Sequence, residues 1–160
     1  MINPPLQRHP SLQPFSRDHY VGLVQAQRLI KANASSPAKQ RRDALAGFLR
    51  AWNEEIRVHF DDEERLLLPI TADASQRRQL TDEHAELRSL AAEAERLAGA
   101  VDVDASWLNR VGALLERHIR WEERELFPAI ERTAGAEDIR RLESETAAIE
   151  AARPRNACAK

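Results

Sequence analysis

Apolar residues recur along most of the chain at alternating steps of three and four positions, the spacing that places them on one face of an α-helix. Between residues 38 and 68 this stripe passes through Leu45, Leu49, Trp52, Ile56, His59, Glu63 and Leu66. Between residues 104 and 127 it passes through Leu108, Val111, Leu115, His118, Glu122 and Leu126. No stretch alternates between apolar and polar residues as a half-buried strand would. The pattern therefore predicts an all-α protein.

The same spacing predicts two more long helices, at about 16–34 and 75–98. Their stripes are expected to pass through Phe15, His19, Leu23, Ala26 and Ile30, and through Leu80, His84, Leu87, Ala91 and Ala94. The candidate N-cap residues are Ser16, Ser75 and Asp104. Because the connections between the long helices are short, neighbours should pack antiparallel. We expect an up-down-up-down four-helix bundle with a short C-terminal helix.

Prolines mark the predicted limits of the folded unit. Four prolines among the first 14 residues predict an extended N-terminal arm, residues 1–14. The bundle is expected to cover 15–132, a weakly amphipathic C-terminal helix 133–152, and a flexible tail 153–160. A length of 160 residues suits a single domain of this kind.

Each long helix places a histidine on its apolar stripe, and two helices add a glutamate one turn later. These candidate metal ligands are His19, His59, Glu63, His84, His118 and Glu122. A carboxylate buried without a partner shifts its pKa or destabilises the fold. Histidine and glutamate four positions apart lie on one helix face and reach the same centre. Four imidazoles and two carboxylates meeting in a bundle suit two divalent ions, with the carboxylates as bridges.

The two His-Glu segments are near copies, HFDDEERLLLPI at 59–70 and HIRWEERELFPAI at 118–130. The offset from His59 to His118 is 59 positions, the same as from Glu63 to Glu122. The repeat predicts two half-sites related by a pseudo-twofold axis. A histidine on an apolar stripe is alternatively a hydrogen-bonded core residue. Four histidines on four separate stripes favour metal binding.

With these motifs the chain resembles the hemerythrin-like (HHE cation-binding) family, from about residue 15 to 130. The resemblance implies a non-haem di-iron centre, in which two iron ions are bridged by oxo, hydroxo or solvent. It also implies that the four histidines are terminal ligands and that Glu63 and Glu122 are bridging carboxylates. Manganese and zinc are alternatives, because mixed imidazole and carboxylate ligation suits all three metals.

One departure from the oxygen-carrying members of that family is Arg88. Those proteins have a second histidine at this position, one turn after the ligand of the third helix. Without that nitrogen the shell is closer to the di-iron domain of iron–sulfur cluster repair proteins, although the cysteine-containing N-terminal region of those proteins is missing here. We therefore expect open or solvent-filled coordination positions and no durable, reversible oxygen carriage.

Four acidic residues adjoin the candidate ligands. Glu64 and Glu123 directly follow the two bridging glutamates, and a helical step of about 100° turns them away from the metals. We expect them at the surface or around the site. Asp18 and Glu83 precede histidines whose rings they could orient, but we expect them to be solvated.

Composition narrows the partners. A net charge of −2 argues against nucleic acid or an anionic membrane as a partner. The apolar runs are far shorter than the roughly 20 residues of a membrane span, and the first residues lack an apolar signal core. The single cysteine, Cys158, excludes an internal disulfide and favours a reducing cytoplasm. Neither Cys158 nor His9 is expected to have a role.

The expected function is that of a cytoplasmic di-iron protein, a monomer or homodimer, which senses, stores or buffers O₂, NO or iron. One alternative is an enzyme that takes electrons from an unknown donor to reduce NO or peroxide, or that delivers iron for iron–sulfur cluster repair. Another is a structural metal-binding bundle without redox chemistry. The chain has no ExxH motif, which argues against a ferritin-like oxidase, and no HExxH motif of a zinc protease. No catalytic residue is predicted.

Overall fold

The computed structural model describes residues 7–153, which form α-helices and short connections without any β-strand. The helices are α1 (Gln13–Lys31), α2 (Ala38–Ala51), α3 (Arg57–Leu67), α4 (Ala74–Leu97), α5 (Ala105–Trp121), α6 (Phe127–Thr133) and α7 (Ala136–Ala152). Two π-helical segments, Trp52–Ile56 and Glu122–Leu126, join α2 to α3 and α5 to α6, and a 3₁₀ turn follows α3 at Leu68–Ile70. The predicted all-α class is confirmed.

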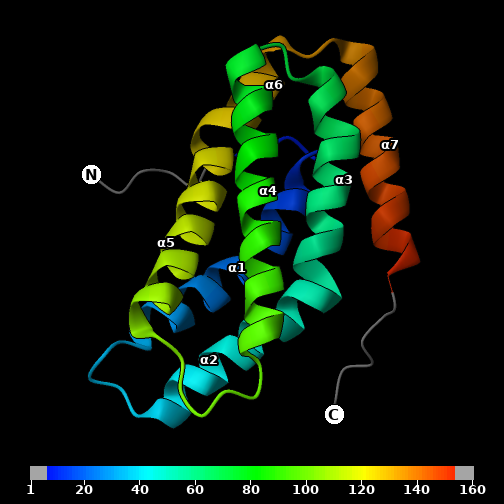
Figure 1. The fold of residues 1–160 in the computed structure, drawn as a ribbon. Helices are drawn as coiled ribbons and strands as arrows, with labels where there is room; N and C mark the ends of the chain where they lie inside the picture. The colour runs from blue at the N-terminus through cyan, green and yellow to red at the C-terminus, as the bar shows by residue number, and fades with distance from the viewer. Residues whose placement is uncertain (1–6, 154–160) are drawn as a thin grey trace.

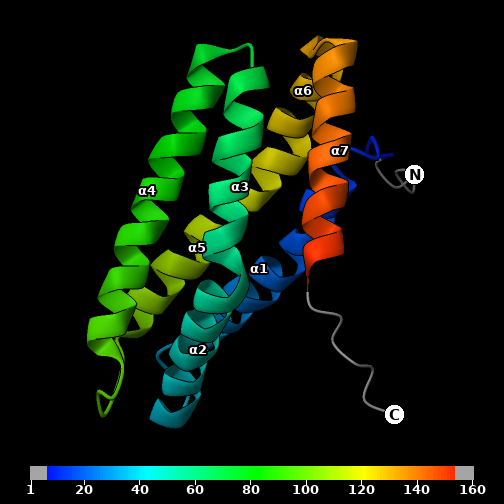
Figure 2. The same ribbon diagram turned by 90° about the vertical axis from the view of Figure 1, so that its right-hand side faces the viewer.

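The long helices form an antiparallel bundle (Figure 1). In that view α1 descends, α2 and α3 return upward, α4 descends, and α5 and α6 rise. The turned view in Figure 2 shows α7 lying along the outside of the bundle. None of the helices in the described range is long and apolar enough to cross a membrane. Residues 1–6 of the predicted arm lie outside the described residues, as do residues 154–160 of the tail with Cys158.

The bundle core consists of two apolar clusters separated by a polar layer. The larger cluster includes Leu29, Phe48, Leu87 and Leu108. The smaller cluster includes Phe15, Leu67, Leu80 and Phe127, and α7 adds Leu142 to it. The bundle has four long helical segments, since α2 continues into α3 and α5 into α6. On each of them the predicted ligands lie between residues of the two clusters. The ligands are therefore held between two packed apolar layers, which restrict both helix movement and access of water.

Two predicted N-caps are wrong. Helix α1 begins at Gln13 rather than near Ser16, with Leu12 at the N-cap. Pro14 belongs to its first turn, because a proline lacks the N–H that has no helical partner there. Helix α4 is capped by Asp73, whose carboxylate accepts from the backbone of Ser75 and of Gln76.

The third cap, Asp104, is confirmed, but the helix it starts ends later than expected. The carboxylate of Asp104 accepts from the backbone of Ser106. The apolar stripe predicted a helix to about residue 127, yet helix continues to Thr133. In the π-helical segment the N–H of Phe127 bonds to the carbonyl of Glu122, five residues back. Pro128 thereby falls in the first turn of α6, where a proline is tolerated.

The apolar stripe of α1 also differs from the prediction. Leu23 and Ile30 are only partly buried, and the inward line runs through Phe15, His19, Gly22, Ala26 and Leu29. The reason lies in the close packing of α1 against α5. A Cβ on Gly112 would lie 2.7 Å from the carbonyl oxygen of Ala26, and one on Gly22 would lie 2.6 Å from Cδ1 of Ile119. Two glycines thus let the helices that carry His19 and His118 approach each other.

We predict that Gly112→Ala lowers the free energy of unfolding by about 1–3 kcal/mol, as overpacking does. The carbonyl of Ala26 cannot move aside without displacing α1. The cost of this displacement outweighs the gain from the better helix propensity of alanine. Gly22→Ala is the matched control, since it meets only the flexible end of Ile119 and should cost less. Urea unfolding measures both. Equal stability of the Gly112→Ala protein and the wild type would show that the two backbones are not in contact.

Candidate metal centre

All six predicted ligands meet in the polar layer. They come from α1, α3, α4, α5 and the π-helical segment that begins at Glu122. All are buried, and His59 is the most exposed of them at 8 %. Their Nε2 and carboxylate oxygen atoms fall into two neighbouring groups.

The first group is built on His19 and His59. Nε2 of His19 lies 3.5 Å from Oε1 of Glu63 and 3.1 Å from Oε2 of Glu122. Nε2 of His59 lies 2.9 Å from Oε1 of Glu63. We call this group the first position.

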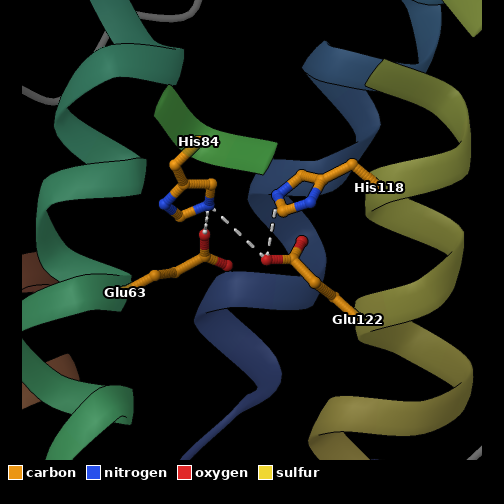
Figure 3. Close-up of side chains that lie close together, drawn as sticks. All are labelled: Glu63, His84, His118 and Glu122. Atoms are coloured by element: carbon orange, nitrogen blue, oxygen red, sulfur yellow. Dashed lines mark ion pairs between the residues drawn. The ribbon is translucent and has the colours of Figure 1, made fainter. Parts of the chain in front are cut away.

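The second group is built on His84 and His118, which Figure 3 shows turned toward the two glutamates. Nε2 of His84 lies 3.3 Å from Oε2 of Glu63 and 3.8 Å from Oε1 of Glu122. Nε2 of His118 lies 3.1 Å from Oε1 of Glu122. We call this group the second position. Each glutamate thus turns one oxygen toward each group, although in the first group Oε2 of Glu122 lies near His19 alone.

The atoms at the centre of the layer have no hydrogen-bond partner. This holds for Nε2 of all four histidines and for both carboxylate oxygens of Glu63 and of Glu122, all of them buried. Each of these histidines is bonded through Nδ1 to a different carboxylate. A neutral ring that donates from Nδ1 presents a lone pair at Nε2. Eight acceptors then face one another without a donor, an arrangement that cations satisfy. The residues therefore fit bound metal ions.

Four carboxylates surround the centre and bond to Nδ1 of the histidines. Two of them, Asp18 and Glu83, bond to a ring on another helix of the bundle. Asp18 Oδ2 lies 3.3 Å from Nδ1 of His59, and Glu83 Oε2 lies 2.7 Å from Nδ1 of His118. The expectation that these acids are solvated is wrong. They orient a histidine, but not the one that follows them in sequence.

The other two outer carboxylates directly follow the central glutamates. Glu64 Oε1 lies 2.9 Å from Nδ1 of His84, and Glu123 Oε1 lies 2.6 Å from Nδ1 of His19. The helical step of about 100° that turns Glu64 and Glu123 away from the centre places each carboxylate beside the neighbouring helix. All four bonds obey the predicted pseudo-twofold relation. These bonds could have been predicted from the sequence, because an acidic residue occupies equivalent positions in both half-sites.

Charges at the centre of the site shift the pKa values of its histidines and glutamates when no metal is bound. Burial alone would lower the pKa of His59, but the charge of Glu63 and the bond to Asp18 outweigh it and raise that pKa to about 9. Burial likewise acts against the pKa of His118, which the charge of Glu122 raises to about 10. Burial would raise the pKa of Glu63, yet the charge of His59 and the close approach of the other histidines keep it well below its usual range.

Two further residues singled out by the sequence lie away from the centre. Arg88 donates to Glu64 at 2.7 Å and to Asp61 at 3.0 Å. It therefore supports the carboxylate that orients His84 and supplies no ligand. His9 bonds through Nδ1 to Ser11 at 2.8 Å, ahead of α1.

A cavity of about 560 Å³ reaches the site from one side. His19 and His59 line it, whereas His84 and His118 do not. Its apolar wall consists of Val21, Gly22, Ile56, Val58, Phe60, Leu115 and Ile119, and its polar lining of Asp18, Glu54, Glu55 and Arg153. The two positions are therefore unequal, because the cavity leads to the first position only.

Comparison with known proteins agrees with this geometry. The family model described as "Hemerythrin HHE cation binding domain" matches residues 17–102 and 75–152. Together these ranges cover all seven helices except the first turn of α1. No curated protein and no solved structure matches the chain.

We predict that Glu63→Gln and Glu122→Gln each lower the metal content at both positions. Each carboxylate faces both histidine pairs, and an amide replaces one acceptor by a donor that points at a cation. The purified variants should hold less than half the metal of the wild type, measured by elemental analysis. His9→Ala, a histidine change outside the centre, is the control and should bind as the wild type does. A glutamine variant with undiminished metal content would show that this glutamate is not a ligand.

We also predict that metal stabilises the fold more as the pH rises from about 6 to 9. The raised pKa values of His59 and His118 stabilise the metal-free fold while both rings are protonated, and this contribution is lost as pH rises through about 9 and 10. Metal binding must displace these protons, so protons compete less at high pH. Melting temperatures of the metal-loaded and metal-free forms give the difference at each pH. A difference independent of pH would contradict protonated histidines in the metal-free site.

Proposed function

Because the chain belongs to the hemerythrin HHE cation-binding family, we propose that it holds two iron ions and uses them to sense, store or buffer O₂, NO or iron. The observation that carries the proposal is the set of eight buried acceptor atoms without a donor. They divide into two groups, His84 and His118 with an oxygen of each glutamate, and His19 and His59 with an oxygen of Glu63. Oε2 of Glu122 approaches the latter group at His19. Two divalent ions match this division, and a single ion would leave one histidine pair unsatisfied.

Iron supplies reversible one-electron chemistry and binding of small ligands, and the chain supplies the setting for both. His19 and His59 would hold the ion at the first position, and His84 and His118 the ion at the second. Glu63 and Glu122 would couple the ions by bridging them. Manganese and zinc fit the same donors, so the identity of the metal is part of the proposal.

The cavity supports a role in small-molecule binding over a purely structural role. A metal site that serves only stability has all its ligand positions closed by protein. Here a cavity of about 560 Å³ ends at His19 and His59. The side chains described there offer only two nitrogens and two carboxylate oxygens to the first ion, which leaves room for an exogenous ligand. A neutral diatomic molecule such as O₂ or NO, or peroxide, suits the apolar wall.

The same cavity supports the enzyme alternative, reduction of NO or peroxide with electrons from a donor protein. The two functions share all ligands and differ in turnover. Steady consumption of NO or peroxide in the presence of a reductant would assign the enzyme function. Binding of one equivalent without further consumption would assign the sensor or buffer function.

We predict that the reduced iron-loaded protein oxidises quickly in air and forms no oxygenated species that lasts for hours. The cavity has charged groups beside the first position, among them Asp18 and Arg153, and these draw in water that displaces a weakly held ligand. Arg88 pairs with Glu64 and adds no nitrogen to the second position. The test is an optical spectrum recorded after O₂ is admitted to the anaerobic protein. An oxygenated form that persists and is reversed under vacuum would overturn this prediction.

We predict that Val58→Trp slows binding of NO to the reduced protein without changing its metal content. Val58 lines the cavity and is half exposed, so an indole there narrows the access route. The control is Val101→Trp, since Val101 is exposed in the loop before α5 and does not line the cavity. Stopped-flow spectra give the rates. Equal rates in the two variants would show that NO reaches the metals by another path.

A further inference from the structure

Each carboxylate that orients a histidine has its own outer hydrogen-bond donor. At the second position both donors belong to α4. Arg88 donates to Glu64 at 2.7 Å, and Gln79 donates to Glu83 at 3.1 Å. The second position is thus supported from within the four-helix bundle.

At the first position both donors come from outside the bundle. Arg8, which precedes α1, donates to Glu123 Oε2 at 2.8 Å. Arg153, which follows α7, donates through its two terminal nitrogens to the two oxygens of Asp18, at 2.6 Å each. Arg8 lies 115 residues from Glu123 in sequence, and Arg153 lies 135 residues from Asp18.

We propose that Arg8 and Arg153 are positioning residues for the first position, so that the two ends of the described chain hold one metal ion while the bundle alone holds the other. Arg8 acts on His19 through Glu123, and Arg153 acts on His59 through Asp18. This inference rests on the proposed function, because it presupposes two bound ions.

The fork of Arg153 restricts Asp18 strongly. A bidentate guanidinium fixes both the place and the plane of a carboxylate. Oδ2 is shared, since it also faces Nδ1 of His59 at 3.3 Å. Of the residues that line the cavity, Arg153 is the only arginine or lysine.

The ring of His59 depends on this bond more than those of His19 and His84 do, since His19 stacks on Phe127 with planes 14° from parallel. His84 stacks on Phe60 with centroids 3.8 Å apart and planes 7° from parallel. His59 has only inclined aromatic neighbours, with interplanar angles of 66° to Phe15 and 78° to His19. It also borders the cavity, so packing does not fix its orientation and Asp18 must.

Arg8 has a second task that fixes its place. The π-helical bond from Phe127 to Glu122 deprives the carbonyl of Glu123 of its α-helical donor, and Pro128 has no N–H to replace it. Arg8 donates to that carbonyl at 2.7 Å. Its side chain is only 6 % exposed, so the guanidinium is held where it also reaches the carboxylate that orients His19.

The consequence concerns the ion that the cavity reaches. The first position, which the cavity reaches, is supported by Arg8 and Arg153 at the two ends of the described chain. The second position, which the cavity does not reach, is supported by α4. Displacement of either end would loosen the first ion and leave the second in place.

The test follows release of metal from the full-length, two-ion protein into excess chelator. Removal of the carboxylate bonded to a metal-bound histidine costs about 10–100-fold in affinity, and removal of the arginine that holds this carboxylate should cost less. Arg153→Met and Arg8→Met should each release one ion several-fold faster, up to about tenfold, and the other at the wild-type rate. The double variant should still release only one ion fast. Arg88→Met should also release one ion fast, but combined with Arg153→Met it should release both fast.

Two controls separate positioning from a general effect on α7. Arg17 on α1 pairs with Glu150 of α7 at 3.6 Å, so Arg17→Met removes a contact between the same helices and should release metal as the wild type does. In an Asp18→Asn background, Arg153→Met should have no further effect, because Arg153 acts through Asp18. Since Arg153 is 44 % exposed, its substitution leaves the core packing intact.

Release from Arg153→Met at wild-type rates, or equal acceleration of both ions, would overturn the positioning role. So would an Arg17→Met protein that behaves like Arg153→Met. A wild-type protein that holds fewer than two ions overturns the proposed function itself, and this result is seen before any variant is made.

Discussion

Mutual repulsion of buried lone pairs is the constraint on which this structure depends. Glu63 and Glu122 turn four carboxylate oxygens toward four imidazole nitrogens, all buried and none hydrogen-bonded. Burial of unpaired charge is costly. Without metal the site lowers this cost by binding protons, because the carboxylates raise the pKa values of His59 and His118. Metal ions would replace those protons. Cation binding and bundle stability are therefore two aspects of one arrangement.

The rest of the molecule holds these groups in register. Two apolar clusters enclose the polar layer, and close packing at Gly22 and Gly112 sets the distance between the helices that carry His19 and His118. Around the layer, four carboxylates fix the histidine rings and select the tautomer that presents Nε2 to the centre. Beyond them, three arginines and a glutamine fix the carboxylates. The pseudo-twofold relation extends from the candidate ligands to the carboxylates and ends at these outer donors, because Arg88 and Gln79 belong to α4 whereas Arg8 and Arg153 lie outside the bundle.

Helical periodicity predicted the bundle and the meeting of the six candidate ligands, because each of them lies on the apolar stripe of its own helix. The spacing of residues within one helix carries no information about which side chains of the neighbouring helix it will meet. Leu23 was therefore expected inward in place of Gly22, whose burial is set by the approach of α5. The roles of Asp18 and Glu83 were missed for the same reason, since each acid bonds to a ring on another helix. The bond between Arg153 and Asp18 joins residues 135 positions apart, a separation that local patterns do not bridge.

The most direct test of the two-ion centre is a crystal structure of the iron-loaded protein with anomalous scattering recorded at the iron edge. The geometry predicts two anomalous peaks between Glu63 and Glu122, one within bonding distance of Nε2 of His19 and His59 and one within bonding distance of Nε2 of His84 and His118. A single peak, or a peak on other side chains, would contradict the account.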